Sequence, residues 1–229
     1  MKRVKKRTRF FVINFDVLDK SVTKLFKPIK TAENKYFRIF KIKPKSFNII
    51  LVYSRKEFDK YVGFKTENWV DGYVKLDSLI MFSPSVKDNY LQRNVPMSYK
   101  SFFDHEINHF FYISLVGSYS PVWLGEGYAC YMSDSMPSPL EKDRFRQIKN
   151  PQKFLFYKYI KKSYFRYANE FYSISFYVVT YLIENYGHNK ILKLIKRFAK
   201  KPNKNSFDKE FKQIYGITTK EAVKNSISN

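Results

Sequence analysis

The chain has 229 residues, of which 44% are hydrophobic and 19% aromatic. This composition is sufficient for one buried core and excludes a disordered or fibrous protein. The single cysteine, Cys130, excludes an intramolecular disulfide framework and any zinc site built from cysteines alone. The formal net charge of +23 indicates either an anionic partner or a compositional bias, and the even spread of the basic residues along the chain favours the bias.

The first half of the sequence predicts a mixture of helices and strands. Apolar positions recur every three or four residues between residues 17 and 40, which is typical of a helix. Phe47–Tyr53 is a β-rich run, and Ser54 can cap a short helix after it. Val70–Leu76 and Leu79–Phe82 predict a β-hairpin.

The second half predicts helices almost throughout. Tyr99–Val116 forms one predicted helix, and Ser120 followed by Pro121 predicts the start of the next, with Ser120 as the N-cap. Phe171–Tyr186 is apolar nearly all round and predicts a central buried helix. The class is therefore α+β, with a small N-terminal sheet and hairpin followed by a mostly helical C-terminal half.

Two of the three histidines occur in the sequence His105-Glu106-Ile107-Asn108-His109, inside a predicted helix. Residues four apart share one helix face, so both imidazoles can bind one ion. Glu106 lies beside that face and can reach a metal-bound water without being a ligand. This arrangement suits metal-assisted hydrolysis. The alternative, two solvated or capping histidines, disagrees with the aromatic flanks, which predict a buried helix: Phe102, Phe103, Phe110 and Phe111.

A zinc site with two histidines requires a third ligand. Glu126 is the only carboxylate in the next predicted helix, where Gly125 and Gly127 flank it. Two antiparallel helices joined by a short loop would bring Glu126 back towards the histidines. A surface carboxylate is the alternative, and the apolar neighbours Trp123 and Leu124 argue against it.

The segments HEINHFF and SPVWLGEGYACYMSD resemble the active-site segment of the gluzincin metallopeptidases, specifically the compact peptidase MA-like families. In these families HExxH is followed by a Trp-Leu-x-Glu-Gly block. The similarity extends over residues 47–226. It implies a compact gluzincin-like domain over residues 47–229, preceded by a basic N-terminal arm and packing helix over residues 1–46.

The resemblance implies a zinc-dependent metallopeptidase that hydrolyses peptide bonds. Carried over to this chain, His105, His109 and Glu126 would bind the zinc, and Glu106 would be the general base that activates the zinc-bound water. A peptide or protein would be the substrate.

The resemblance also implies a donor for the oxyanion and a strand that binds the peptide. Tyr172 is the candidate donor, and Tyr167 is the second choice. Such enzymes bind peptide as an extra strand on a sheet edge. We expect that edge at Gly72, Tyr73 and Val74, because Gly72 allows close backbone approach.

One position departs from the family pattern. Thermolysin-like enzymes place an aspartate four residues after the ligand glutamate to orient a zinc histidine, and this chain has Cys130 there. Cys130 either faces the metal or is a small core residue. Asp104 and Asp134 are the candidates to replace that aspartate.

Two other interpretations remain. The first is a basic nucleic-acid- or membrane-binding module on a peptidase-like fold, with structural zinc; Glu106 argues against it, because a structural site needs no base. We expect weak binding to nucleic acid or anionic membrane, since no aromatic-basic binding motif is present. The second, a toxin, effector or regulator of narrow specificity, fits the same residues.

The N-terminal segment lacks the apolar stretch of a signal peptide, so we expect a cytoplasmic protein.

Overall fold

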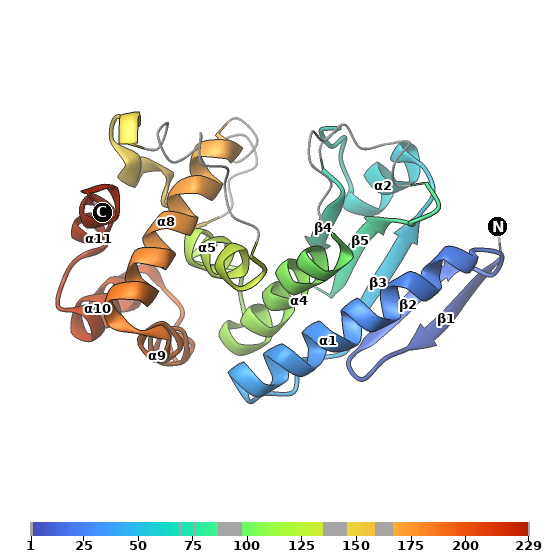
Figure 1. Ribbon diagram of the computed structural model, residues 1–229, viewed down its shortest axis with the longest axis horizontal. Coiled ribbons are helices and arrows are strands. Elements are labelled where there is room, and N and C mark those ends of the chain that lie inside the picture. Colours follow the sequence, from blue (N-terminus) through green and yellow to red (C-terminus); the bar gives the residue numbers. More distant parts are fainter. Residues whose placement is uncertain are drawn as a thin grey trace. The chain divides into compact units, whose positions relative to one another are not determined.

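The computed structural model divides into two compact units, Met1–Phe111 and Tyr112–Asn229. Figure 1 shows strands and helices in the first unit and helices in the second. The small sheet followed by a mostly helical half confirms the predicted α+β class. The described residues are 2–68, 70–75, 77–86, 98–134, 146–158 and 167–228.

The first unit contains a five-stranded mixed sheet in the order β1-β2-β3-β5-β4. Its central strands are parallel: β2 (Phe11–Asp16), β3 (Phe47–Val52) and β5 (Ser78–Phe82). Their apolar side chains form the core of the sheet, and Ile13, Ile49 and Leu79 are fully buried. The edge strands are antiparallel to their neighbours: β1 (Arg3–Arg7) and β4 (Gly72–Lys75). The pairing of β4 with β5 confirms the predicted hairpin.

The basic N-terminal segment forms the edge strand β1. Arg3 lies opposite Asp16 of β2, and its guanidinium pairs with Glu57. The same side chain donates a hydrogen bond to the carbonyl oxygen of Leu51, at 2.7 Å. Charged side chains are common on edge strands because they discourage pairing with a further chain.

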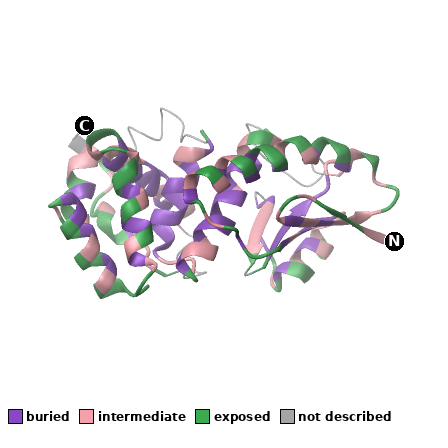
Figure 2. Ribbon diagram, turned by 90° about the horizontal axis from the view of Figure 1, so that it is seen from below, coloured by how far each residue is buried: buried purple, intermediate pink, exposed green. Residues whose placement is uncertain are grey.

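Helices α1 (Thr23–Phe40) and α2 (Arg55–Val62) belong to the first unit. Figure 2 shows α1 with buried residues along one side and exposed residues along the other. Ser54 caps α2 as predicted, because its Oγ accepts a hydrogen bond from the Glu57 amide at 3.1 Å. Gly63 ends α2 in a left-handed conformation, with φ of 96°.

Helix α4 (Tyr99–Val116) has the predicted bounds and is buried by aromatic packing. The ring of Phe110 lies 4.2 Å from that of Phe47 on β3, centre to centre. Phe111 stacks on Phe40 of α1, with centres 5.9 Å apart. These contacts fix α4 against both the sheet and α1, and they place its histidines in a low-dielectric environment.

The second unit is built from helices, with α8 (Ala168–Tyr186) as the central buried one, as predicted. Gly187 ends α8, and α9 (His188–Phe198) follows at once. The buried side of α9 consists of apolar residues: Ile191, Leu194, Ile195 and Phe198. The remaining elements are α5 (Val122–Met132), a 3-10 turn (Pro151–Phe154), α10 (Lys204–Tyr215) and α11 (Thr219–Ser228).

The predicted start of α5 was wrong by one residue. The helix begins at Val122, so that Pro121 occupies the N-cap position and Ser120 does not cap the helix. The first amides are satisfied by another segment instead: Val122 donates to the carbonyl of Tyr157 at 3.2 Å, and Trp123 to that of the preceding Phe156 at 3.1 Å. A side-chain cap is unnecessary where a tertiary contact supplies the acceptors.

None of the described helices is long and apolar enough to cross a bilayer.

Candidate metal centre

His105 and His109 lie one turn apart on α4, and both are buried. Their Nε2 atoms are 3.1 Å apart, and the rings are nearly perpendicular, at 88°. Two zinc–nitrogen bonds of about 2.0–2.1 Å at a tetrahedral angle would separate the two nitrogens by about 3.3 Å. The two imidazoles are therefore spaced as ligands of one shared ion would be.

Glu106 is half-buried and lies beside the edge strand β4. A β-carbon on Gly72 would be 3.4 Å from Oε1 of Glu106 and 2.7 Å from Cζ of Phe102. The backbone of β4 thus approaches this carboxylate at a position that has no side chain. The predicted strand and the predicted base are neighbours within the first unit.

Glu126 lies in the second turn of α5 and is only 4% exposed. Its Oε1 accepts a hydrogen bond from the Tyr119 hydroxyl, at 2.6 Å. This bond fixes the orientation of a buried carboxylate, and sequence reasoning missed it. Tyr119 lies in the loop before α5, where no helical spacing relates it to Glu126.

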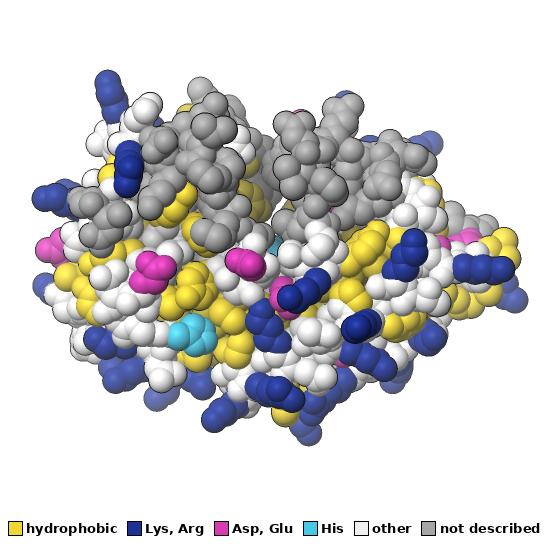
Figure 3. Space-filling view, in the orientation of Figure 1, with side chains coloured by type: hydrophobic (Ala, Val, Ile, Leu, Met, Phe, Trp, Pro, Cys, Tyr) yellow, Lys and Arg dark blue, Asp and Glu magenta, His cyan; other side chains and the backbone are white. Residues whose placement is uncertain are grey.

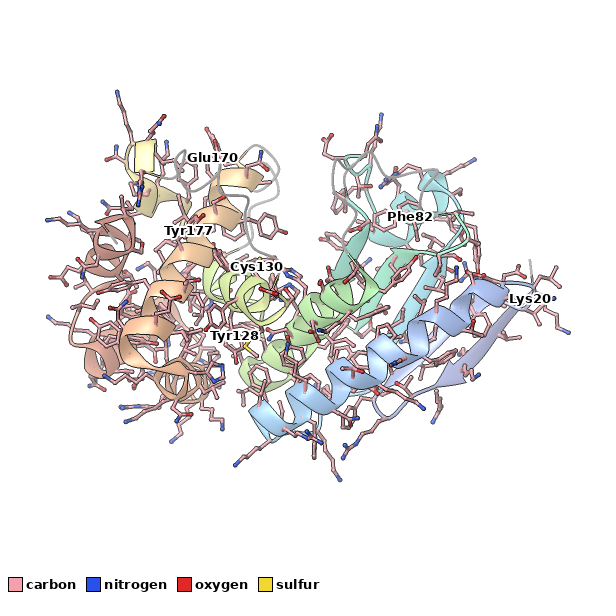
Figure 4. All side chains as sticks on the ribbon, viewed as in Figure 1. Lys20, Phe82, Tyr128, Cys130, Glu170 and Tyr177 are labelled. Carbon is pink, nitrogen blue, oxygen red and sulfur yellow. The ribbon has the colours of Figure 1, made fainter. Side chains whose placement is uncertain are left out.

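The two glycines beside Glu126 differ in their surroundings. A β-carbon on Gly127 would lie 2.2 Å from the carbonyl oxygen of Ser175 on α8, so α5 and α8 are in backbone contact there. A β-carbon on Gly125 would be 3.6 Å from its nearest neighbour, an ordinary contact distance. Figure 4 shows the resulting arrangement, with Tyr128 and Cys130 on α5 and Tyr177 on the adjacent α8. Gly127 therefore sets the position of the helix that carries Glu126.

His105, His109 and Glu126 form a group of potential metal ligands among the described residues. One ligand atom from each residue lies within 4.8 Å of the others, and all three residues are buried. Two imidazoles and one carboxylate are a donor set used by catalytic zinc sites, which leave a further coordination position open. The chemistry of these donors fits a zinc ion.

The predicted oxyanion donors lie on or next to α8, and the predicted substrate strand is β4. Tyr172 is half-buried on α8, and its ring packs against Phe171 at 5.5 Å. Tyr167 directly precedes α8, and its ring packs on Phe154 at 5.4 Å. Tyr73 is half-buried in β4, as is Val74. The roles assigned to these residues stay predictions.

The two aspartates considered as partners of a zinc histidine have other surroundings. Asp104 is buried, and its Oδ2 accepts a hydrogen bond from Nζ of Lys35 on α1, at 3.1 Å. Asp134 is exposed, two residues after the end of α5. Cys130, at the position where the family pattern has aspartate, is buried on α5.

The third histidine forms a separate contact in the second unit. Nε2 of His188, the first residue of α9, is 2.8 Å from the hydroxyl of Tyr128 on α5, and the two rings are stacked. Burial lowers the pKa of His188 and raises the pKa of Tyr128. A neutral imidazole can accept a hydrogen bond from the Tyr128 hydroxyl, so the pair links α5 to the start of α9.

A comparison with protein families matches the part of the chain that contains the candidate metal centre. The family model of the peptidase MA superfamily matches residues 99–226, from the start of α4 into α11. A comparison with curated proteins found no match. The family match extends over more than half of the chain and includes His105, His109 and Glu126. The chain belongs to the peptidase MA superfamily.

Proposed function

We propose that the protein is a zinc-dependent metallopeptidase that hydrolyses peptide bonds. The spacing of the two buried histidines, with Nε2 atoms 3.1 Å apart, is the observation that carries the proposal. Membership of the peptidase MA superfamily supports it. The presence of Glu106 next to the first histidine favours an enzyme over a structural zinc protein, because a structural site has no use for a base.

His105, His109 and Glu126 would hold the ion. Zinc, when bound, supplies a Lewis acid that polarises a carbonyl group and lowers the pKa of water. The chain contributes an oriented set of ligands. Tyr119 holds one oxygen of Glu126, and the surrounding aromatic residues keep the histidines buried. Buried, oriented ligands reduce the reorganisation needed when the ion binds.

Glu106 is the proposed general base. Its carboxylate would accept a proton from the attacking water and then deliver that proton to the departing amine nitrogen, so that the carboxylate is regenerated in each turnover. Its half-buried position favours this role, because a base must be both desolvated and reachable by substrate. The tyrosine proposed to stabilise the oxyanion is Tyr172.

The edge strand β4 is the proposed binding site for the peptide backbone. A peptide can add to an exposed sheet edge through main-chain hydrogen bonds. Gly72, Tyr73 and Val74 would provide this edge, and the absence of a side chain at Gly72 lets the backbone of β4 lie close to Phe102 and Glu106. A peptide paired with β4 would therefore run past the base.

Metal analysis of protein purified without added metal tests the proposal. Wild type should contain about one zinc per chain, and Glu106→Gln should retain it. His109→Ala and Glu126→Ala should each lose most of the zinc while keeping the helical circular dichroism spectrum. Less than about a tenth of an equivalent of zinc in wild type, with no uptake on titration, would overturn the metal assignment.

A further inference from the structure

Helix α1 exposes a face that contains no acidic residue. The only acidic residue of the helix, Glu33, is buried and accepts hydrogen bonds from the Thr8 hydroxyl and the Phe10 amide. Positions three and four apart share one side of a helix, so the cations of α1 gather on its outer side. The exposed residues of α1 are Thr23, Lys24, Lys27, Lys30, Thr31, Asn34 and Arg38. We call Lys24, Lys27, Lys30 and Arg38 the basic face.

Two further cations flank the basic face. The ammonium group of Lys6 on β1 lies 4.4 Å from the centre of the Phe26 ring on α1. The guanidinium of Arg9 lies 4.0 Å from the centre of the Phe37 ring, on the same helix. Basic residues far apart in sequence are thus brought together, and Figure 3 shows many dark blue side chains in the region of α1. The even spread along the sequence conceals this concentration.

The charges of the basic face are not compensated within the described part of the chain. None of its four cations has an ion pair among the described residues, whereas the neighbouring Lys35 pairs with Asp104. Lys24, Lys27 and Lys30 follow one another at intervals of three, and like charges at that spacing repel. An anionic partner would relieve this repulsion.

An exposed apolar turn leads into the same helix. Leu18 is 84% exposed and Val17 48%, and Leu18 is the most exposed large apolar side chain among the described residues. The turn is held in place, because the Leu18 amide donates to Oδ1 of Asp16 at 2.9 Å and the Val17 amide donates to the carbonyl of Lys2 at 3.0 Å. Lys20, labelled in Figure 4, lies between this turn and α1.

We propose that the first unit docks on an anionic lipid bilayer through the basic face of α1, with Leu18 entering the headgroup region. An anionic leaflet attracts clustered lysines and arginines, and an apolar side chain gains free energy when it leaves water at the interface. A nucleic acid would use the cations but would leave Leu18 in water. The exposed leucine in the turn that leads into α1 therefore favours a membrane over a nucleic acid as the partner.

Co-sedimentation with vesicles tests the proposal. Wild type should bind vesicles of phosphatidylcholine mixed with phosphatidylglycerol and should not bind vesicles of phosphatidylcholine alone. The triple variant Lys24→Gln, Lys27→Gln, Lys30→Gln should bind the anionic vesicles about tenfold or more weakly. The matched control neutralises three exposed lysines of α9, Lys190, Lys193 and Lys196, and should change binding by no more than about twofold.

Leu18→Ser separates the two classes of partner. It should weaken binding to the anionic vesicles and leave any binding to duplex DNA unchanged. Equal weakening by the α1 and α9 triple variants would show that only net charge matters and would overturn the proposal. Tighter binding to duplex DNA than to vesicles, with no effect of Leu18→Ser on the vesicles, would also overturn it. All substituted residues are exposed, so circular dichroism spectra should be unchanged.

Discussion

Gly127 lies against the backbone of Ser175, and a β-carbon at position 127 would be 2.2 Å from the Ser175 carbonyl oxygen. The obstacle is main chain within a helix, which cannot rotate away as a flexible side chain can. Any side chain at this position must push α5 from α8. The preceding residue is Glu126, so the proposed ligand would move with α5.

We expect Gly127→Ala to lower the free energy of unfolding by about 1–3 kcal/mol and to weaken zinc binding. Gly125→Ala is the matched control on the other side of Glu126. It should be tolerated, and the gain in helix propensity should be about 0.5–1 kcal/mol. Chemical denaturation and zinc titration of both variants measure the difference. Equal stability of the two variants would contradict the backbone contact.

Gly72→Ala should impair hydrolysis while zinc binding is retained. The new β-carbon would lie 2.7 Å from the Phe102 ring and 3.4 Å from the Glu106 carboxylate, so it would displace the ring and crowd the base. The three atoms nearest to that β-carbon belong to Phe102 and Glu106, and none of them belongs to a proposed zinc ligand. Steady-state kinetics on a cleaved peptide, together with zinc content, measure the two effects separately.

Phe102→Leu should partly restore the activity that Gly72→Ala loses. It removes the ring atoms that the alanine would meet, so the double variant Gly72→Ala, Phe102→Leu should recover part of the activity lost in Gly72→Ala. If Gly72→Ala has wild-type kinetics, the backbone of β4 does not border the reaction site.

The stability of the protein should fall at mildly acidic pH because of His188. Burial holds its pKa below the usual value of 6.5, so the unfolded chain binds a proton at a higher pH than the folded chain does. The stabilisation is therefore complete above about pH 6.5 and is lost as pH falls through the folded-state pKa. His188→Gln should have a flatter dependence of unfolding free energy on pH over that range.

Tyr128→Phe is the control for the pH dependence. It removes the hydroxyl that contacts His188 but leaves the imidazole half-buried. Its unfolding free energy should be lower by about 0.5–1.5 kcal/mol at neutral pH, with the acid-side slope retained. A slope in His188→Gln equal to that of wild type would assign the acid sensitivity to other groups.

Local patterns in the sequence predicted the elements that carry the candidate site. The bounds of α4, the hairpin of β4 and β5, and the capping of α2 by Ser54 follow from apolar periodicity and turn chemistry. The HExxH spacing places both histidines on one helix face, because the helical repeat alone determines that geometry.

Contacts between residues far apart in the sequence could not be predicted from these local patterns. The pairing of Arg3–Arg7 with β2 could not be predicted, because a run of charged residues lacks the apolar alternation that indicates a strand. An edge strand can form without that alternation, since charged side chains are tolerated at the edge of a sheet. The start of α5 depends on carbonyls supplied by Phe156 and Tyr157, from a distant segment. The hydrogen bond from Tyr119 to Glu126 likewise depends on how the intervening loop folds.

The central claim is that Glu106 is the base of a zinc peptidase, and the most direct measurement is hydrolysis of a peptide library by zinc-loaded wild type and zinc-loaded Glu106→Gln. The glutamine is nearly isosteric but accepts no proton from water, so turnover should fall by about a hundredfold or more at equal zinc content. Wild type should cleave defined peptide bonds. Equal rates for the two proteins, or no cleavage of any peptide by zinc-loaded wild type, would contradict the account.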